Sequence, residues 1–79
     1  MMEEEQIKEL FLEQAQIDES LWHRELTFDE LALDSLQLLE LVVGLEQAFD
    51  IQLDDQRLAR CETVGEALDF VLARIRGEI

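Results

Sequence analysis

No proline and only three glycines interrupt this 79-residue chain, so the residues that usually end helices are almost absent. Apolar side chains recur at helical spacing over residues 3–16, 35–49 and 64–75. The length suits one small domain, and the chain shows no repeat, low-complexity tract or second domain. We therefore expect an all-α fold in which residues 1–79 form a single domain.

Three main helices and a short fourth are predicted to form a small bundle. The first helix carries Ile7, Leu10, Phe11 and Ala15 at helical spacing. The short helix is expected over residues 54–60, because its acids precede its arginines and so match the helix dipole. A capping box of Thr63 and Glu66 is predicted to open the last helix. The buried stripe of that helix is expected to comprise Val64, Ala67, Leu68, Val71, Leu72 and Ile75.

The first connection, residues 17–34, is long for a structureless loop and shows no clean period. It nevertheless carries seven apolar side chains: Ile17, Leu21, Trp22, Leu26, Phe28, Leu31 and Leu33. We expect a long, packed crossover loop, with room for a helical turn of its own, in which Trp22 packs the loop against the core.

The chain is strongly acidic, with 20 acidic and six basic residues and a formal charge of −14. Such a field repels nucleic acid and anionic lipid and steers basic partners toward the protein. A hydrophobic share of 48% favours a packed core over disorder. The single cysteine excludes an internal disulfide, and neither a signal peptide nor a bilayer-spanning stretch is visible. We expect a cytoplasmic monomer with no membrane or nucleic-acid partner.

The stretch Leu33-Asp34-Ser35-Leu36 stands at the start of the second main helix. Asp34 can cap that helix, which leaves Ser35 in the first turn beside unpaired backbone N–H groups. A phosphate on this serine would be favoured by those donors and by the helix dipole. Taken alone, the tetrapeptide leaves two interpretations open: an attachment point for a phosphate-linked group, or a polar residue beside a cap.

The second main helix carries two apolar stripes. The core face is predicted to hold Leu38, Leu41, Val42, Leu45 and Phe49. The opposite side holds Leu36, Leu39 and Val43, interleaved with Glu40, Glu46, Gln47 and Asp50. Either another segment covers this second strip, or the strip is a docking surface for partners with basic patches.

Nothing in the sequence predicts a catalytic or metal site. His23 could complete a triad with Ser35 on paper, but the glycines of a nucleophile elbow are missing and the domain offers little room for a cleft. Asp54 and Asp55 lack calcium-loop spacing, and Cys61 is expected to be a small buried residue. A small hydrolase that uses Ser35 is the least favoured hypothesis, and we expect no enzyme.

From residue 28 to residue 70 the chain resembles the acyl carrier proteins of fatty acid, polyketide and related synthesis. The matching segments are Leu31-Ala32-Leu33-Asp34-Ser35-Leu36, Glu40-Leu41-Val42, Leu45-Glu46, Phe49-Asp50-Ile51 and Thr63-Val64. The Asp-Ser-Leu motif is weak alone, but it is specific when joined to the downstream segments at the right distance.

This resemblance implies that Ser35, flanked by Asp34 and Leu36, carries 4′-phosphopantetheine. A phosphopantetheinyl transferase donates the group from coenzyme A with the help of Mg²⁺, and the terminal thiol then holds acyl groups as thioesters. The carrier itself catalyses nothing. Acyl-transferring and condensing synthase enzymes are implied to dock at Leu36, Glu40, Val43, Glu46 and Leu53. The helical projection adds Leu39 and Asp50 to that surface.

The sequence departs from the family pattern at two positions. The family often has glycine at Ala32, and bacterial fatty-acid carriers often have an acid at Gln37. Housekeeping fatty-acid synthesis and a specialised polyketide or lipid pathway therefore both stay open. Two alternatives also remain: an aminoacyl or peptidyl carrier domain, and an unmodified acidic protein-interaction module.

Overall fold

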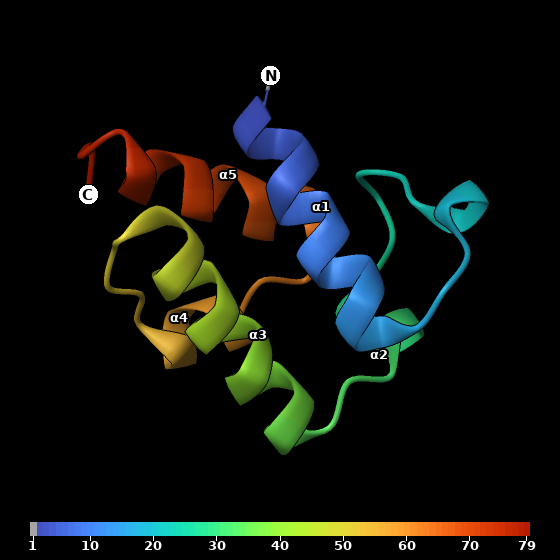
Figure 1. Cartoon of the computed structure of the whole chain (residues 1–79). Helices are drawn as coiled ribbons and strands as arrows, with labels where there is room; N and C mark the ends of the chain where they lie inside the picture. The colour runs from blue at the N-terminus through green and yellow to red at the C-terminus, as the bar shows by residue number, and fades with distance from the viewer. Residues whose placement is uncertain (1) are drawn as a thin grey trace.

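The computed structural model describes residues 2–79, and these contain helices but no strand. The helices are α1 (Met2–Ala15), α2 (Phe28–Leu31), α3 (Ser35–Phe49), α4 (Asp55–Ala59) and α5 (Val64–Ile75), with one 3₁₀ turn, η1 (Glu19–Leu21). Helix α1 packs against both α3 and α5, and the short α4 packs near α3 (Figure 1). The predicted all-α bundle of three main helices is confirmed. No helix in the described part of the chain has the length and apolar character that a bilayer crossing requires.

The helix limits agree with prediction to within a residue or two. Helix α3 begins and ends where the periodicity indicated. Helix α1 stops at Ala15 because Gln16 takes a positive φ of 56°, which ends the helical path. At the short helix α4, Asp54 and Arg60 are caps rather than helical residues.

The long first connection contains two helical turns, η1 and α2, where the sequence suggested room for one. Phe11 of α1 is fully buried, and it meets the rings of Trp22 and Phe28 edge-on, with centroids 5.7 and 6.1 Å apart. Leu26 and Leu31 are buried beside them. The predicted packing of Trp22 against the core is confirmed, and the connection is a packed part of the fold.

Backbone hydrogen bonds join this connection to the start of α5. Val64 N donates to Leu26 O at 2.8 Å, and Gly65 N donates to Arg24 O at 2.9 Å. A Cβ on Gly65 would lie only 2.9 Å from that same Arg24 oxygen, so the close approach requires glycine. The Arg24 guanidinium also pairs with Asp69 at 2.6 Å. No local sequence pattern around Gly65 predicts this role.

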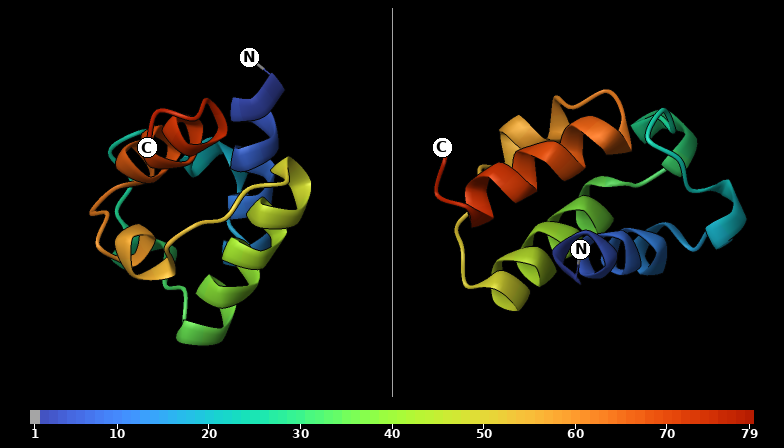
Figure 2. Two further views of the ribbon diagram at one scale, coloured as in Figure 1. Left: turned by 90° about the vertical axis from the view of Figure 1, so that its left-hand side faces the viewer. Right: turned by 90° about the horizontal axis from the view of Figure 1, so that it is seen from above.

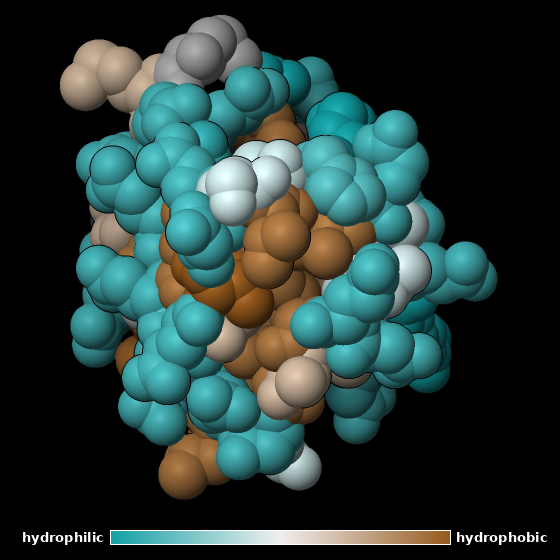
Figure 3. All heavy atoms as spheres, turned by 90° about the vertical axis from the view of Figure 1, so that its right-hand side faces the viewer, coloured by the Kyte–Doolittle hydropathy of each residue, from teal (hydrophilic) through white to brown (hydrophobic). Residues whose placement is uncertain are grey.

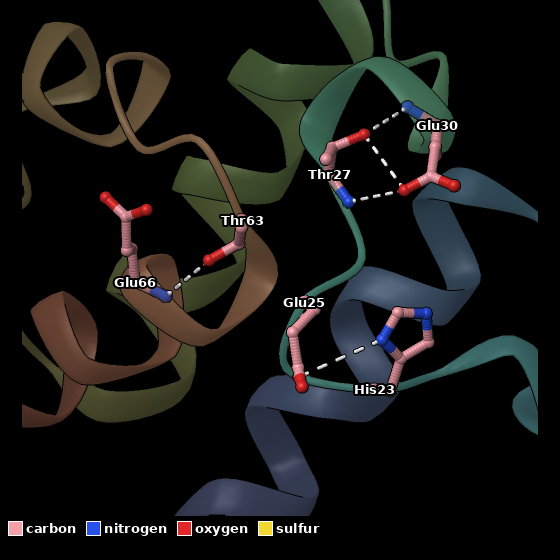
Figure 4. A network of polar contacts seen from close by, with 6 residues as sticks. All are labelled: His23, Glu25, Thr27, Glu30, Thr63 and Glu66. Carbon is pink, nitrogen blue, oxygen red and sulfur yellow. Dashed lines mark hydrogen bonds and ion pairs between the residues drawn. The ribbon is translucent and has the colours of Figure 1, made fainter.

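Threonines cap both α2 and α5, but in different ways (Figure 4). At α2, the Thr27 hydroxyl accepts from Glu30 N at 3.1 Å, and Thr27 N donates to the Glu30 carboxylate at 2.9 Å. The bonds that Thr27 donates lower the pKa of Glu30. At α5, Thr63 accepts from Glu66 N at 3.2 Å, but the described bonds include none from Thr63 N back to the Glu66 carboxylate. The capping box predicted at Thr63 is therefore only half formed.

The core is apolar throughout, and the described residues include no buried polar or charged side chain. The largest fully buried side chains are Phe11, Ile7, Leu41, Leu45, Leu58, Val64 and Val71. The predicted α5 stripe is buried except for Ile75, which is half-buried. On α3, Leu41, Val42 and Leu45 are buried, whereas Leu38 and Phe49 are only half-buried at the ends of the stripe.

We predict that Phe11→Ala destabilises the fold more than Phe49→Ala does. Loss of the fully buried Phe11 ring removes the contact for Trp22 and Phe28 and should cost about 3–5 kcal/mol of unfolding free energy. Loss of the half-buried Phe49 ring should cost about 1–3 kcal/mol. Urea denaturation of both variants measures the difference. Equal costs would contradict the central role given to Phe11.

Candidate functional site

Ser35 is the first residue of α3, and a reciprocal pair of hydrogen bonds fixes the helix start around it. Asp34 Oδ1 accepts from Gln37 N at 2.7 Å, and Asp34 N donates to Gln37 Oε1 at 3.0 Å. The predicted Asp34 cap is confirmed. Gln37 Nε2 also donates to Gln14 O at 3.1 Å, which ties the start of α3 to the end of α1. Sequence reasoning treated Gln37 only as a departure from a family pattern and missed both of its bonds.

The backbone around Ser35 suits a phosphate ester. Ser35 is exposed, and the N–H groups of Ser35 and Leu36 have no partner among the hydrogen bonds of residues 2–79. These free donors stand at the positive end of the dipole of a 15-residue helix. A phosphate on the Ser35 oxygen would therefore gain two donors and a favourable field without disturbing the core.

Ala32, three residues before Ser35, has a strained backbone conformation. Ala32 ends α2 with φ 55° and ψ 37°, and its N–H donates to Phe28 O and Asp29 O. An L-residue with a Cβ pays for this left-handed conformation, whereas glycine does not. Glycine, which the acyl carrier family often has at this position, would adopt the backbone conformation of Ala32 at a lower energetic cost.

The second apolar strip of α3 is uncovered. Leu36, Leu39 and Val43 are 64%, 49% and 41% exposed, and Glu40 is exposed beside them. Helix α3 runs along an edge of the molecule (Figure 2). The alternative in which another segment covers this strip is therefore wrong. Because large apolar side chains are exposed together beside an acid, the strip has the composition of a protein-docking surface.

Glu46 differs from Glu40, although both were predicted to face partners. Glu46 is half-buried, and its Oε2 accepts from Leu53 N at 2.8 Å. Its carbonyl oxygen accepts from Asp50 N and Ile51 N, so Glu46 holds the connection between α3 and α4. Asp50 is exposed at the end of α3 with φ 54°, and Leu53 is half-buried against the core. Among the acids of this surface, Glu46 makes a structural bond through its carboxylate, whereas the described bonds include none to the carboxylates of Glu40 and Asp50.

The other polar candidates are not brought to Ser35. His23 Nδ1 lies 4.0 Å from a carboxylate of its own loop, that of Glu25 (Figure 4). No described side chain hydrogen-bonds the Ser35 hydroxyl, and residues 2–79 contain no group of three metal-ligating side chains. Cys61 is half-buried rather than buried as predicted; it follows the cap of α4, where its N–H donates to Leu58 O at 3.1 Å. Burial raises the pKa of its thiol, which keeps it protonated and a poor nucleophile.

Comparison with known proteins agrees with this geometry. Residues 5–71 match the model of the family described as "Phosphopantetheine attachment site". The fold is similar to the solution structure of a holo acyl carrier protein from Geobacter metallireducens, with a TM-score of 0.76 and 24% sequence identity. That match covers 99% of this chain and 91% of the other.

The family match over residues 5–71, together with the helical bundle and the exposed serine at the start of α3, defines a carrier protein with a phosphopantetheine attachment site. The chain belongs to the phosphopantetheine-attachment family, in which acyl carrier proteins are found. Its cofactor is covalently attached phosphopantetheine.

We predict that Ala32→Gly stabilises the fold. Relief of the left-handed strain should exceed the extra backbone entropy that glycine loses on folding, with a net gain of about 0.5–1 kcal/mol. Urea denaturation should show a higher midpoint at unchanged slope. The matched control is Asp50→Gly at φ 54°, where the gain should be smaller because aspartate tolerates this conformation. A lower free energy of unfolding in Ala32→Gly would contradict the claim that the left-handed conformation strains Ala32.

Proposed function

We propose that this protein is an acyl carrier whose Ser35 bears 4′-phosphopantetheine and presents thioester-bound acyl groups to biosynthetic enzymes. The observation that supports it most directly is the position of Ser35 at the start of a capped 15-residue helix. Its side chain is exposed there, and no described side chain hydrogen-bonds its hydroxyl. This serine lies within the residues that match the family model. The group, when bound, supplies the thiol that carries the acyl chain.

In the proposed attachment step, Ser35 Oγ attacks the phosphorus of coenzyme A that bears the pantetheine arm. A new O–P bond forms, the adenosine bisphosphate portion leaves, and the hydroxyl proton passes to the transferase. Asp34 Oδ1 is engaged with Gln37 N and positions the helix start rather than taking that proton. The free N–H groups of Ser35 and Leu36 stabilise the resulting phosphodiester.

The proposed partners are the phosphopantetheinyl transferase and the acyl-transferring and condensing enzymes of a fatty acid, polyketide or related pathway. They are proposed to meet the strip formed by Leu36, Leu39 and Val43, which is bordered by Glu40. A formal charge of −14 steers basic enzyme surfaces toward the carrier, and the apolar strip holds them once they arrive. Glu46, Asp50 and Leu53 are proposed to extend this surface toward α4.

An aminoacyl or peptidyl carrier is the second candidate, since such domains share the serine and the bundle. The heavy acidity of the chain favours the acyl carrier.

We predict that Ser35 is the single site of modification. With coenzyme A, Mg²⁺ and a broad-specificity transferase, intact mass should show one phosphopantetheine adduct, and Ser35→Ala should abolish it with helicity unchanged. The matched control is Ser20→Ala, at the other serine of the chain, which lies in the three-residue turn η1. An adduct that persists in Ser35→Ala, or that disappears in Ser20→Ala, would refute the assignment.

We predict that charge reversal separates the roles of Glu40 and Glu46. Glu40→Lys should lower the transferase kcat/KM several-fold at low salt, and the loss should shrink as salt screens the charges. The melting temperature of Glu40→Lys should stay unchanged. Glu46→Lys should lower both the kcat/KM and the melting temperature, because Leu53 N loses its acceptor.

The control for general charge is Glu25→Lys, on the long first connection. If Glu25→Lys slows the transferase as much as Glu40→Lys does, steering is a property of the net charge and not of the α3 surface.

A further inference from the structure

The basic residues of this acidic protein are distributed unevenly. Lys8 pairs with Glu19 at 2.8 Å and Arg24 pairs with Asp69 at 2.6 Å. The remaining four basic residues lie on α4 and α5 or on the caps that end them: Arg57, Arg60, Arg74 and Arg76. Within residues 2–79, none of these four has a carboxylate within ion-pair distance, although the chain holds 20 acids. These four arginines therefore remain without an ion-pair partner, and two of them, Arg57 and Arg74, lie close to one another.

Two of these arginines line an open hollow of about 380 Å³, which we call the arginine hollow. It lies between the α3–α4 connection, α4 and the end of α5, and these segments face the viewer in the left-hand view of Figure 2. The guanidinium of Arg57 stands 5.1 Å above the ring of Phe70, and Arg74 Nε donates to Gln52 O at 2.9 Å. Both guanidinium groups are thus held in place, and each keeps further N–H donors free.

The lining of the arginine hollow suits a carboxylate on a short apolar stem. Guanidinium groups bind carboxylates through two parallel hydrogen bonds, and the apolar atoms of Phe70 and Leu53 can take the stem. Asp54 also lines the hollow, but its Oδ1 accepts from Gln56 N and Arg57 N at the start of α4. Gln52 and Ile79 complete the lining, which thus holds two arginine side chains and one acidic side chain on a chain whose formal charge is −14.

A different hollow is less informative. The long first connection forms a hollow of about 430 Å³, and its apolar lining includes Ile17, Leu21 and Leu26. The connection occupies the face of the molecule drawn in Figure 3, which shows an apolar patch bordered by polar side chains. Nothing in its surroundings indicates what would cover it, whereas the charge of the arginine hollow selects an occupant.

We propose that the arginine hollow is a second docking point, which receives an acidic side chain of the enzyme that docks on α3. This inference depends on the proposed carrier function for the identity of the partner. Leu53 belongs both to the proposed docking surface and to the lining of the hollow, so the two are continuous. They extend along α3, which is about 22 Å long, to the end opposite Ser35.

The arginine hollow would set the orientation in which the partner enzyme docks, and it would also add to the affinity for that partner. A partner whose basic patch meets Glu40 and whose acid meets Arg57 and Arg74 can dock in only one direction along α3. A partner that lacks an acid at that position would leave Arg57 and Arg74 unpaired and would dock less well. Specific enzymes are thereby distinguished from the many basic surfaces that the net charge attracts.

The test uses the intact protein and a blocked acidic peptide, acetyl-Leu-Glu-Leu-Glu-amide, in a ¹⁵N NMR titration at physiological ionic strength. Its amide-matched counterpart, acetyl-Leu-Gln-Leu-Gln-amide, is titrated in parallel. The acidic peptide should shift the resonances of Leu53, Arg57, Phe70 and Arg74 and bind about tenfold more tightly than the counterpart. Arg57→Gln with Arg74→Gln should remove this preference, and Arg57→Gln alone should reduce it without loss of the bond from Arg74 to Gln52 O.

The control is Arg60→Gln with Arg76→Gln, which removes the same charge outside the hollow and should leave the preference intact. Equal binding of both peptides, or equal loss in the control pair, would overturn the proposal. Concentration-dependent dimerisation, seen by sedimentation and lost in Arg57→Gln, would also overturn it and assign the arginine hollow to a second copy of the chain. Modification of Ser35 by the transferase in all variants tests the carrier function separately.

Discussion

The burial of Phe11 is the contact on which the rest of the structure depends. Trp22 and Phe28 both pack on this ring, and through them α1 holds a connection that has few regular hydrogen bonds of its own. Phe28 begins α2, whose end at Ala32 sets the direction of the chain toward Asp34. The place of Ser35 therefore follows from an aromatic contact in the core, several steps away along the chain.

Local features of the site could be read from the sequence, because they follow from helix geometry alone. The limits of α3, the cap at Asp34 and the two stripes of α3 all depend on residues within a few positions of one another. The bond from Leu53 N to Glu46 and the approach of Arg24 O to Gly65 could not be read in this way. Each depends on how separate segments meet, which no local periodicity encodes.

The acidic side chains of this protein have different structural roles, which the total charge does not distinguish. Glu30 and Asp34 accept bonds from backbone N–H groups at helix starts, and Glu46 orders a connection. Glu40 is exposed without such a bond, and we propose that it contacts partners. Since an acid that holds backbone cannot change partners freely, the surface available for recognition is smaller than the count of 20 acids implies.

The presence of glutamine rather than an acid at position 37 changes where charge is available for partner binding along α3. A carboxylate at this position, as bacterial fatty-acid carriers often have, would place a charge in the first turn of α3, two residues from Ser35, and would attract basic enzyme surfaces there. The amide of Gln37 instead accepts from Asp34 N and donates to Gln14 O, which a carboxylate could not do with both groups. The start of α3 is therefore less charged and more firmly held. We therefore propose that partner contact near Ser35 depends on the exposed apolar surface of Leu36 and Leu39, and that the electrostatic contribution shifts to Glu40 and the residues beyond it.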